Sequence, residues 1–157
     1  MKRLIRPSIF VKAILLILLS LPFAGVSAFG GIDSYAIYLN DKLLVKQSLG
    51  DPLDLKTLPL TEKNISDKLV IRYMQCNAPS KVGKNRVITL KNEAGTVVKE
   101  WKFKDVDGEA SDMAIPVKEI LALQKSASGA LSFYYSADGN KSQKLAAVNG
   151  GSKKSNT

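Results

Sequence analysis

Apolar and polar residues alternate with a period of two through most of the chain between residues 34 and 148. This alternation is typical of β-strands that bury one face and expose the other. In segment 68–76, for example, Leu69, Ile71 and Tyr73 share one face. Turn-forming residues such as Asn40–Asp41 interrupt the pattern at short intervals and predict hairpins. The other predicted strands span 34–39, 42–47, 86–91, 96–104, 113–117, 130–136 and 142–148, with a short edge segment within 53–60.

Segment 118–125 departs from this alternation and predicts about two turns of helix, because its residues favour that conformation. About seven or eight short strands with one short helix predict an all-β fold. We expect an antiparallel β-sandwich, either immunoglobulin-like or jelly-roll-like. A small β-barrel is the alternative, since a barrel produces the same alternation.

The start of the chain has the three parts of a secretory signal peptide. The basic residues Lys2, Arg3 and Arg6 precede an apolar run from Ala13 to Ala24, and Val26 and Ala28 occupy positions −3 and −1 of a cleavage site. The run is shorter than the roughly 20 residues that span a bilayer. The sequence therefore predicts cleavage after Ala28 and export to the periplasm or beyond, with a retained anchor as the alternative.

Removal of residues 1–28 leaves one predicted domain, 29–148, followed by a tail at 149–157 whose Gly, Ser, Asn and Lys content is typical of disorder. The formal net charge of +9 belongs mostly to the two ends. The segment 29–140 contains 15 basic and 14 acidic residues, and Arg72 and Arg86 are its two arginines. A nearly neutral body with so little arginine argues against a nucleic-acid partner.

The chain contains no histidine and a single cysteine. Histidine is the commonest general base and metal ligand, so Ser–His and Cys–His nucleophile pairs are excluded. An intramolecular disulfide is excluded as well. Cys76 ends an apolar strand, and we expect it to be a small buried hydrophobic residue. A reactive or intermolecular thiol is the alternative.

One loop has the composition of a calcium site. Asp105, Asp107, Glu109 and Asp112 surround Gly108, and carboxylate oxygens are the ligands that Ca²⁺ prefers. The spacing does not match an EF-hand loop, because Ala110 and Pro116 stand where glycine and glutamate are needed. An ordinary solvated loop is therefore the favoured interpretation, and no cofactor is expected.

Two tyrosines, Tyr38 and Tyr134, fall on the polar faces of their strands and are candidate exposed aromatics. If they cluster, they would mark a sugar or protein contact. Trp101 alternates with Val97 and Phe103, so we expect it in the core.

Several segments together resemble a group of small exported bacterial β-proteins of unassigned function. They are SYAIYLNDKLLVKQ, KEWKF, IPVKEILALQ and LSFYYSADG, and the likeness covers most of residues 32–148. None of these segments is a catalytic motif. The resemblance implies a shared architecture and no particular activity.

These observations favour an exported, monomeric, non-catalytic binding or structural module whose partner is an envelope protein or glycan. Two alternatives remain open. One is a secreted enzyme that relies on carboxylates, with or without Ca²⁺, and the other is a subunit of an envelope complex that pairs through a sheet edge.

Overall fold

A computed structural model describes residues 31–76, 78, 81–105, 112–138 and 141–149 of the chain. All of them belong to one compact unit, Gly31–Thr157. The predicted signal peptide, and the predicted tail beyond Asn149, lie outside the described residues.

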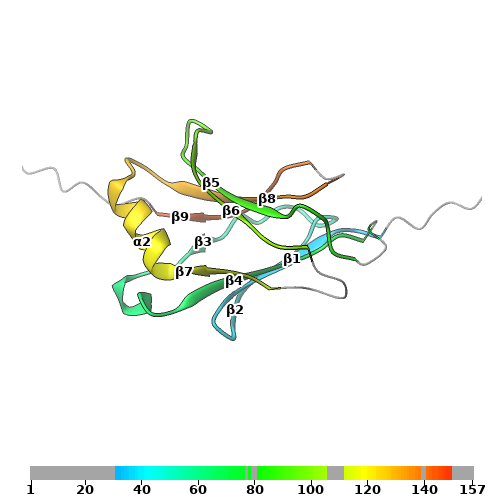
Figure 1. Ribbon diagram of the computed structural model, residues 1–157, viewed down its shortest axis with the longest axis horizontal. Coiled ribbons are helices and arrows are strands. Elements are labelled where there is room, and N and C mark those ends of the chain that lie inside the picture. The colour runs from blue at the N-terminus through cyan, green and yellow to red at the C-terminus, as the bar shows by residue number, and fades with distance from the viewer. Residues whose placement is uncertain (1–30, 77, 79–80, 106–111, 139–140, 150–157) are drawn as a thin grey trace, which may run out of the picture. The chain divides into compact units, whose positions relative to one another are not determined.

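Four strands form a first sheet, sheet A, which lies in the lower part of Figure 1. They are β1 (Ser34–Leu39), β2 (Lys42–Ser48), β4 (Lys68–Met74) and β7 (Met113–Pro116), in the order β2-β1-β4-β7. All three pairs in this sheet are antiparallel. The predicted hairpin at Asn40–Asp41 joins β1 to β2, and Asn40 adopts the positive φ that such a turn requires.

Five strands form sheet B in the upper part of Figure 1, in the order β3-β9-β8-β5-β6. They are β3 (Thr57–Leu58), β5 (Val87–Lys91), β6 (Val97–Lys102), β8 (Leu131–Ser136) and β9 (Gln143–Val148). The two sheets are open and end in edge strands, so the barrel alternative is wrong. The expectation of purely antiparallel pairing is also wrong, because β3 runs parallel to β9. Segment 49–56 carries the chain from β2 in sheet A to β3 in sheet B, where β3 joins the last strand in the same direction.

The predicted helix is confirmed as α2 (Val117–Ser126), and a short 3-10 helix, η1 (Glu62–Asn64), was not predicted. Val117, Ile120, Leu121 and Gln124 are buried, at the spacing of one helical face. Within the part of the chain that the structure describes, no helix has the length and hydrophobicity needed to cross a membrane.

The apolar faces of the two sheets meet in one core. Tyr35 on β1 donates a hydrogen bond of 2.6 Å from its hydroxyl to the carbonyl of Leu145 on β9. The ring of Tyr73 on β4 stacks on that of Tyr135 on β8, with centroids 3.9 Å apart and planes 17° apart. These contacts place β1 opposite β9 and β4 opposite β8. The arrangement is sandwich-like, and the even alternation along β1, β4 and β8 leaves their other side chains on the two outer faces.

The edge strands carry features that hinder pairing with another chain. β3 has two residues, and β7 has four and ends in Pro116, which has no N–H to donate. The longer edges, β2 and β6, each contain one extra residue, because the registers with β1 and β5 skip Leu44 and Val98. Such bulges twist an edge and interrupt its ladder.

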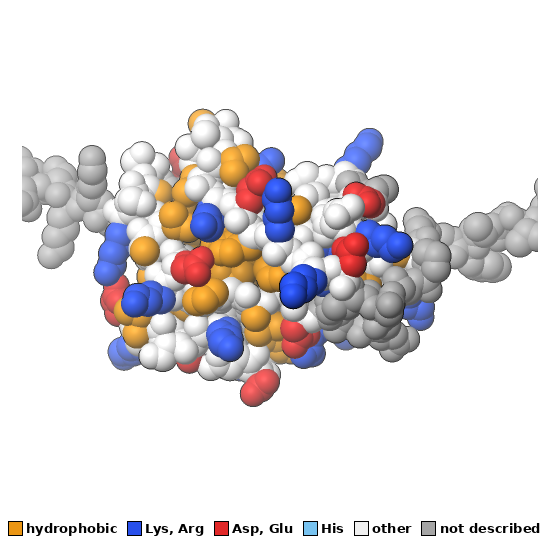
Figure 2. Space-filling view, in the orientation of Figure 1, with side chains coloured by type: hydrophobic (Ala, Val, Ile, Leu, Met, Phe, Trp, Pro, Cys, Tyr) orange, Lys and Arg blue, Asp and Glu red, His pale blue; other side chains and the backbone are white. Residues whose placement is uncertain are grey.

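The bulge at Val98 changes which residues of β6 face the core. The alternation predicts Val97, Trp101 and Phe103 on one apolar face. Instead, Val97 pairs with outward-facing Lys91 and is 49% exposed. Lys99 pairs with the fully buried Leu90 and so occupies the core side of the edge strand. Figure 2 shows apolar side chains gathered between β6 and β7, next to the edge that β6 forms.

We expect Lys99→Val to cause concentration-dependent self-association, because a charge on the core side of an edge strand hinders pairing with other chains. Light scattering coupled to size-exclusion chromatography, over a wide concentration range, measures the effect. Lys102→Val on the outer face of the same strand is the matched control and should elute like the parent protein. Identical elution of both variants and the parent protein would contradict this role for Lys99.

Candidate functional site

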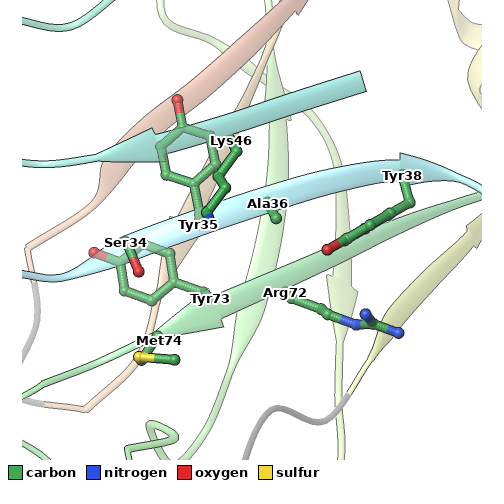
Figure 3. A pocket seen from close by; sticks show the side chains of 8 residues that line it. All are labelled: Ser34, Tyr35, Ala36, Tyr38, Lys46, Arg72, Tyr73 and Met74. Carbon is green, nitrogen blue, oxygen red and sulfur yellow. The ribbon is translucent and has the colours of Figure 1, made fainter. Parts of the chain in front are cut away.

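The outer face of sheet A contains a shallow depression of about 190 Å³. Three strands supply its outward-facing side chains, which are Ser34, Ala36 and Tyr38 from β1, Lys46 from β2, and Arg72 and Met74 from β4. We call these six residues the sheet A depression (Figure 3). Tyr35 and Tyr73 also border it, but both are buried and belong to the core.

The strand register explains why these side chains meet. Ser34 lies opposite Met74, and Ala36 opposite both Arg72 and Lys46. Residues directly opposite each other in an antiparallel pair point to the same face. Because Tyr35, Ile71 and Tyr73 fill the core, their neighbours in the sequence face solvent.

Arg72 is held in place from two sides. Its Nε and Nη2 donate hydrogen bonds of 2.5 Å and 3.0 Å to the two carboxylate oxygens of Asp112. Its guanidinium carbon also lies 4.7 Å from the centre of the Tyr38 ring, a cation–π distance. Figure 3 shows Tyr38 leaning from β1 toward Arg72 on β4. A two-point ion pair and a stacked ring fix a side chain that would otherwise be mobile.

This ion pair perturbs both partners. The hydrogen bonds from Arg72 lower the pKa of the Asp112 carboxyl below its usual value, and Asp112 in turn raises the pKa of the Arg72 guanidinium. Both side chains are nearly half exposed, at 44% and 46%. Solvent screening therefore limits the contribution of the pair to the free energy of unfolding to about 1 kcal/mol or less.

Asp112→Asn should lower the free energy of unfolding at about pH 7 by up to about 1 kcal/mol. Because the folded-state pKa is depressed, the stabilisation is present above the unfolded pKa of about 3.9 and disappears as the pH falls through the lower folded value. Urea unfolding of both proteins at about pH 7 and about pH 2.5 measures this difference. A gap that is equally large at the two pH values would show that charge is not its source.

The four calcium candidates do not come together as a described site. Asp112 is paired with Arg72, and the Asp105 carboxylate accepts a hydrogen bond of 2.7 Å from the backbone N–H of Asn85. Asp107 and Glu109 lie outside the described residues. Among the residues that are described, no three His, Cys, Asp or Glu side chains are grouped so that they could hold a metal ion.

Tyr38 and Tyr134 lie on different sheets and do not form one cluster. Tyr134 alternates with the buried Phe133 and Tyr135, so it faces outward from sheet B, whereas Tyr38 faces outward from sheet A. Each ring is paired with a cation, since the Lys91 ammonium lies 4.7 Å from the centre of the Tyr134 ring. The structure therefore presents two separate outer surfaces.

Cys76 is half-buried rather than fully buried. Its thiol lies 2.9 Å from the carbonyl oxygen of Ile32, and its backbone N–H donates to Asp33 at 2.9 Å. The other carboxylate oxygen of Asp33 accepts a hydrogen bond of 3.0 Å from the Tyr73 hydroxyl. The thiol thus packs against the first described segment of the domain, with Gly31 close beside it.

Trp101 lies at the rim of the core and has a polar partner. It is half-buried, and its indole N–H donates a hydrogen bond of 2.8 Å to Glu119 on the first turn of α2. Its ring also contacts that of Phe133, with centroids 6.2 Å apart. The expected core position is therefore confirmed only in part.

A second depression, of about 260 Å³, lies where α2 meets η1 and is more open to solvent than the first. Lys125 and Glu62 form an ion pair of 2.6 Å there, and the Gln124 amide donates to the carbonyl of Asn149. These side chains satisfy one another, so this depression offers fewer groups to a ligand than the sheet A depression.

Sequence reasoning selected Tyr38 but missed its neighbours Lys46, Arg72 and Met74. The signal was present for two of them, because Arg72 and Met74 alternate with Ile71 and Tyr73 in the strongest predicted strand. Their meeting with Tyr38 depends on the register between β1 and β4, which alternation alone does not specify.

Comparison of the chain with protein-family models, with curated proteins and with solved structures finds no match.

Proposed function

We propose that this protein is an exported, non-catalytic binding module, built as a β-sandwich, whose sheet A depression receives a side chain of a protein partner. The observation that carries the proposal is the depression itself, a hollow of about 190 Å³ on an exposed sheet face. Outward sheet faces of small domains are ordinarily flat and polar, so a hollow lined by tyrosine, methionine and arginine is a specific feature.

The size of the hollow favours a protein partner over a small molecule. Sites for small molecules and cofactors usually measure about 300–1,000 Å³. A hollow of about 190 Å³ is smaller, and it suits one anchoring side chain of a protein interface.

The composition and the rigidity of the hollow agree with this assignment. Tyr, Met and Arg are the residue types enriched at protein interfaces, and Tyr38, Met74 and Arg72 supply one of each. Asp112 and Tyr38 already fix Arg72, so less side-chain freedom is lost when a partner binds.

The alternative of a carboxylate-based enzyme is weakened by the surroundings of the acids. A general acid or base must lie within reach of substrate in a cleft. Instead, many described carboxylates are bound to neighbouring side chains, namely Asp33 to Tyr73, Asp54 to Lys56, Glu62 to Lys125, Asp112 to Arg72, Glu119 to Trp101 and Asp138 to Asn85.

The alternative of pairing through a sheet edge is weakened by the features of the edge strands. Two of these strands are short, two contain bulges, and Lys99 lies on the core side of β6.

The predicted leader supports export to the periplasm or beyond. Under this proposal the mature chain begins at Phe29, and intact-mass measurement of protein recovered from the exporting cell tests that boundary. A mass that includes residues 1–28 would contradict cleavage.

A matched pair of variants tests the binding role. Met74 and Ile65 are exposed to nearly the same extent, 41% and 43%, but only Met74 lines the hollow. Purified Met74→Lys protein should lose retention of its envelope partner at least about tenfold, since a charge then enters an apolar contact. Ile65→Lys should retain it. Equal retention by the two variants, with unchanged melting temperatures, would exclude the sheet A depression as the contact.

A further inference from the structure

The outer face of sheet B differs in chemistry from that of sheet A. It presents ammonium and hydroxyl groups on its strands, and the two depressions described above lie elsewhere on the molecule. We propose that this face binds an anionic polysaccharide, one that carries carboxylates along a chain of sugars. The proposal is independent of the protein contact assigned to sheet A.

Strand register gathers three lysines on this face. Lys144 on β9 lies opposite Tyr134, which lies opposite Thr89 on β5. One row away, Lys91 lies opposite Ser132 on β8. At the other end of β5, Lys102 on β6 lies opposite Val87, which lies opposite Ser136. Because opposite residues share a face, all three ammonium groups point outward with Tyr134 among them.

The charge of the face is positive, although the body of the domain is nearly neutral. Glu100, opposite Thr89, is the acidic residue that register places on these rows, against Lys91, Lys102 and Lys144. A surface with this imbalance attracts a polyanion through interactions that salt screens.

One of the ammonium groups lies against an aromatic ring. Lys91 and Lys144 are half-buried, and the Lys91 ammonium lies 4.7 Å from the centre of the Tyr134 ring. Tyr134 therefore acts as a positioning residue for Lys91 rather than as an open stacking platform. β5 and β9 are two strand spacings apart across β8, so the backbones of Lys91 and Lys144 are separated laterally by about 10 Å. Charges at such spacing can engage separate sugar units of one extended chain.

The polar groups between the lysines favour a saccharide over an acidic protein. Ser132 and Ser136 present hydroxyls on the same rows, whereas Thr89 is buried. A protein contact would need a desolvated apolar centre. The exposed large hydrophobic residue on these rows, Val97, sits at the edge strand instead of at the centre. Hydroxyl and ammonium groups on a flat face match the hydroxyls and carboxylates of a uronic-acid polymer.

Binding of the mature protein to polygalacturonate, with neutral dextran as the uncharged comparison, tests the proposal by affinity electrophoresis. We expect retardation by polygalacturonate alone, and weaker retardation at about 200 mM than at about 50 mM salt. The double variant Lys91→Gln/Lys144→Gln should weaken binding by about tenfold or more, since each basic residue near an anionic surface contributes roughly fivefold.

Control variants locate the effect. Lys46→Gln on sheet A and Lys153→Gln/Lys154→Gln near the end of the chain should each change binding by less than about twofold. The proposal is overturned if polygalacturonate does not bind, if dextran binds equally, or if the control variants lose as much as the double variant. Tighter binding of polyglutamate, with the same dependence on Lys91 and Lys144, would overturn it in favour of an acidic protein.

Met74→Lys should leave polygalacturonate binding unchanged. Loss of the polysaccharide-binding role can therefore be distinguished from loss of the protein-binding role of sheet A.

Discussion

Tyr73→Ala should lower the free energy of unfolding by about 3–5 kcal/mol, the cost typical of removing a large buried aromatic side chain. Tyr73 is 3% exposed, and its ring stacks at 3.9 Å on Tyr135 of the opposite sheet. Its hydroxyl also donates a hydrogen bond to the carboxylate of Asp33, which in turn accepts one from the backbone N–H of Cys76. Truncation therefore removes a contact between the sheets and one anchor of the segment that precedes β1. Domains of this size are usually stable by about 5–15 kcal/mol, so the loss should be visible directly in urea unfolding.

Tyr73→Phe separates the two contributions. The ring stack survives in this variant and the hydrogen bond to Asp33 is lost, so we expect a cost of about 1 kcal/mol. If Tyr73→Phe were as destabilising as Tyr73→Ala, the hydrogen bond rather than the stacked rings would dominate. If Tyr73→Ala cost less than about 1 kcal/mol, the face-to-face packing of the two sheets at this point would be contradicted.

Gly83→Ala should cost about 1–3 kcal/mol, because the site has no room for a methyl group. A Cβ at this position would lie 2.5 Å from the Ala137 Cβ, 2.5 Å from the Gln75 side-chain oxygen and 2.9 Å from the Tyr135 hydroxyl. Gln75, Gly83 and Tyr135 are buried and Ala137 is half-buried, so these atoms have little room to move aside. Thermal unfolding followed by circular dichroism measures the effect as a lowered melting temperature.

Gly95 provides the matched control for Gly83. It has a φ of +79°, which favours glycine, but no atom lies within 4 Å of the position that a Cβ would take. Gly95→Asn should therefore be nearly neutral, since asparagine tolerates this backbone conformation. A loss at Gly83 no larger than the loss at Gly95 would contradict the close packing around Gly83.

The sequence predicted most of the strands because alternation is a local signal. β1, β2, β4 and β8 fall within a few residues of their expected bounds, and α2 was found from its composition. Pairing is not a local property. The parallel partnership of β3 with β9 joins residues about 90 positions apart, and nothing in either segment indicates its direction.

Small irregularities had the largest effect on the expected faces. One extra residue at Val98 moved Val97 to the outer face of β6, away from the side that Trp101 and Lys99 share. A bulge changes the face of every residue beyond it, and the alternation pattern contains no mark of its position.

In the candidate site, too, the local features could be predicted from the sequence and the pairing between distant residues could not. Tyr38 and Tyr134 face outward from their strands, where both are half-buried, but their assignment to separate sheets required the topology. The pairing of Asp112 with Arg72 joins residues 40 positions apart, and it occupies a carboxylate that composition alone had counted among the candidate calcium ligands.

The most direct test of the central claim is site-specific photo-crosslinking in the organism that makes the protein. A photoreactive residue replaces Met74 in the sheet A depression or, as a control of matched exposure, Ile65. We expect one discrete adduct from position 74, its loss when Tyr38→Ala is added, and no such adduct from position 65. An adduct that forms equally from both positions, or the lack of any adduct from position 74 while the protein is correctly exported, would contradict a partner bound at the sheet A depression.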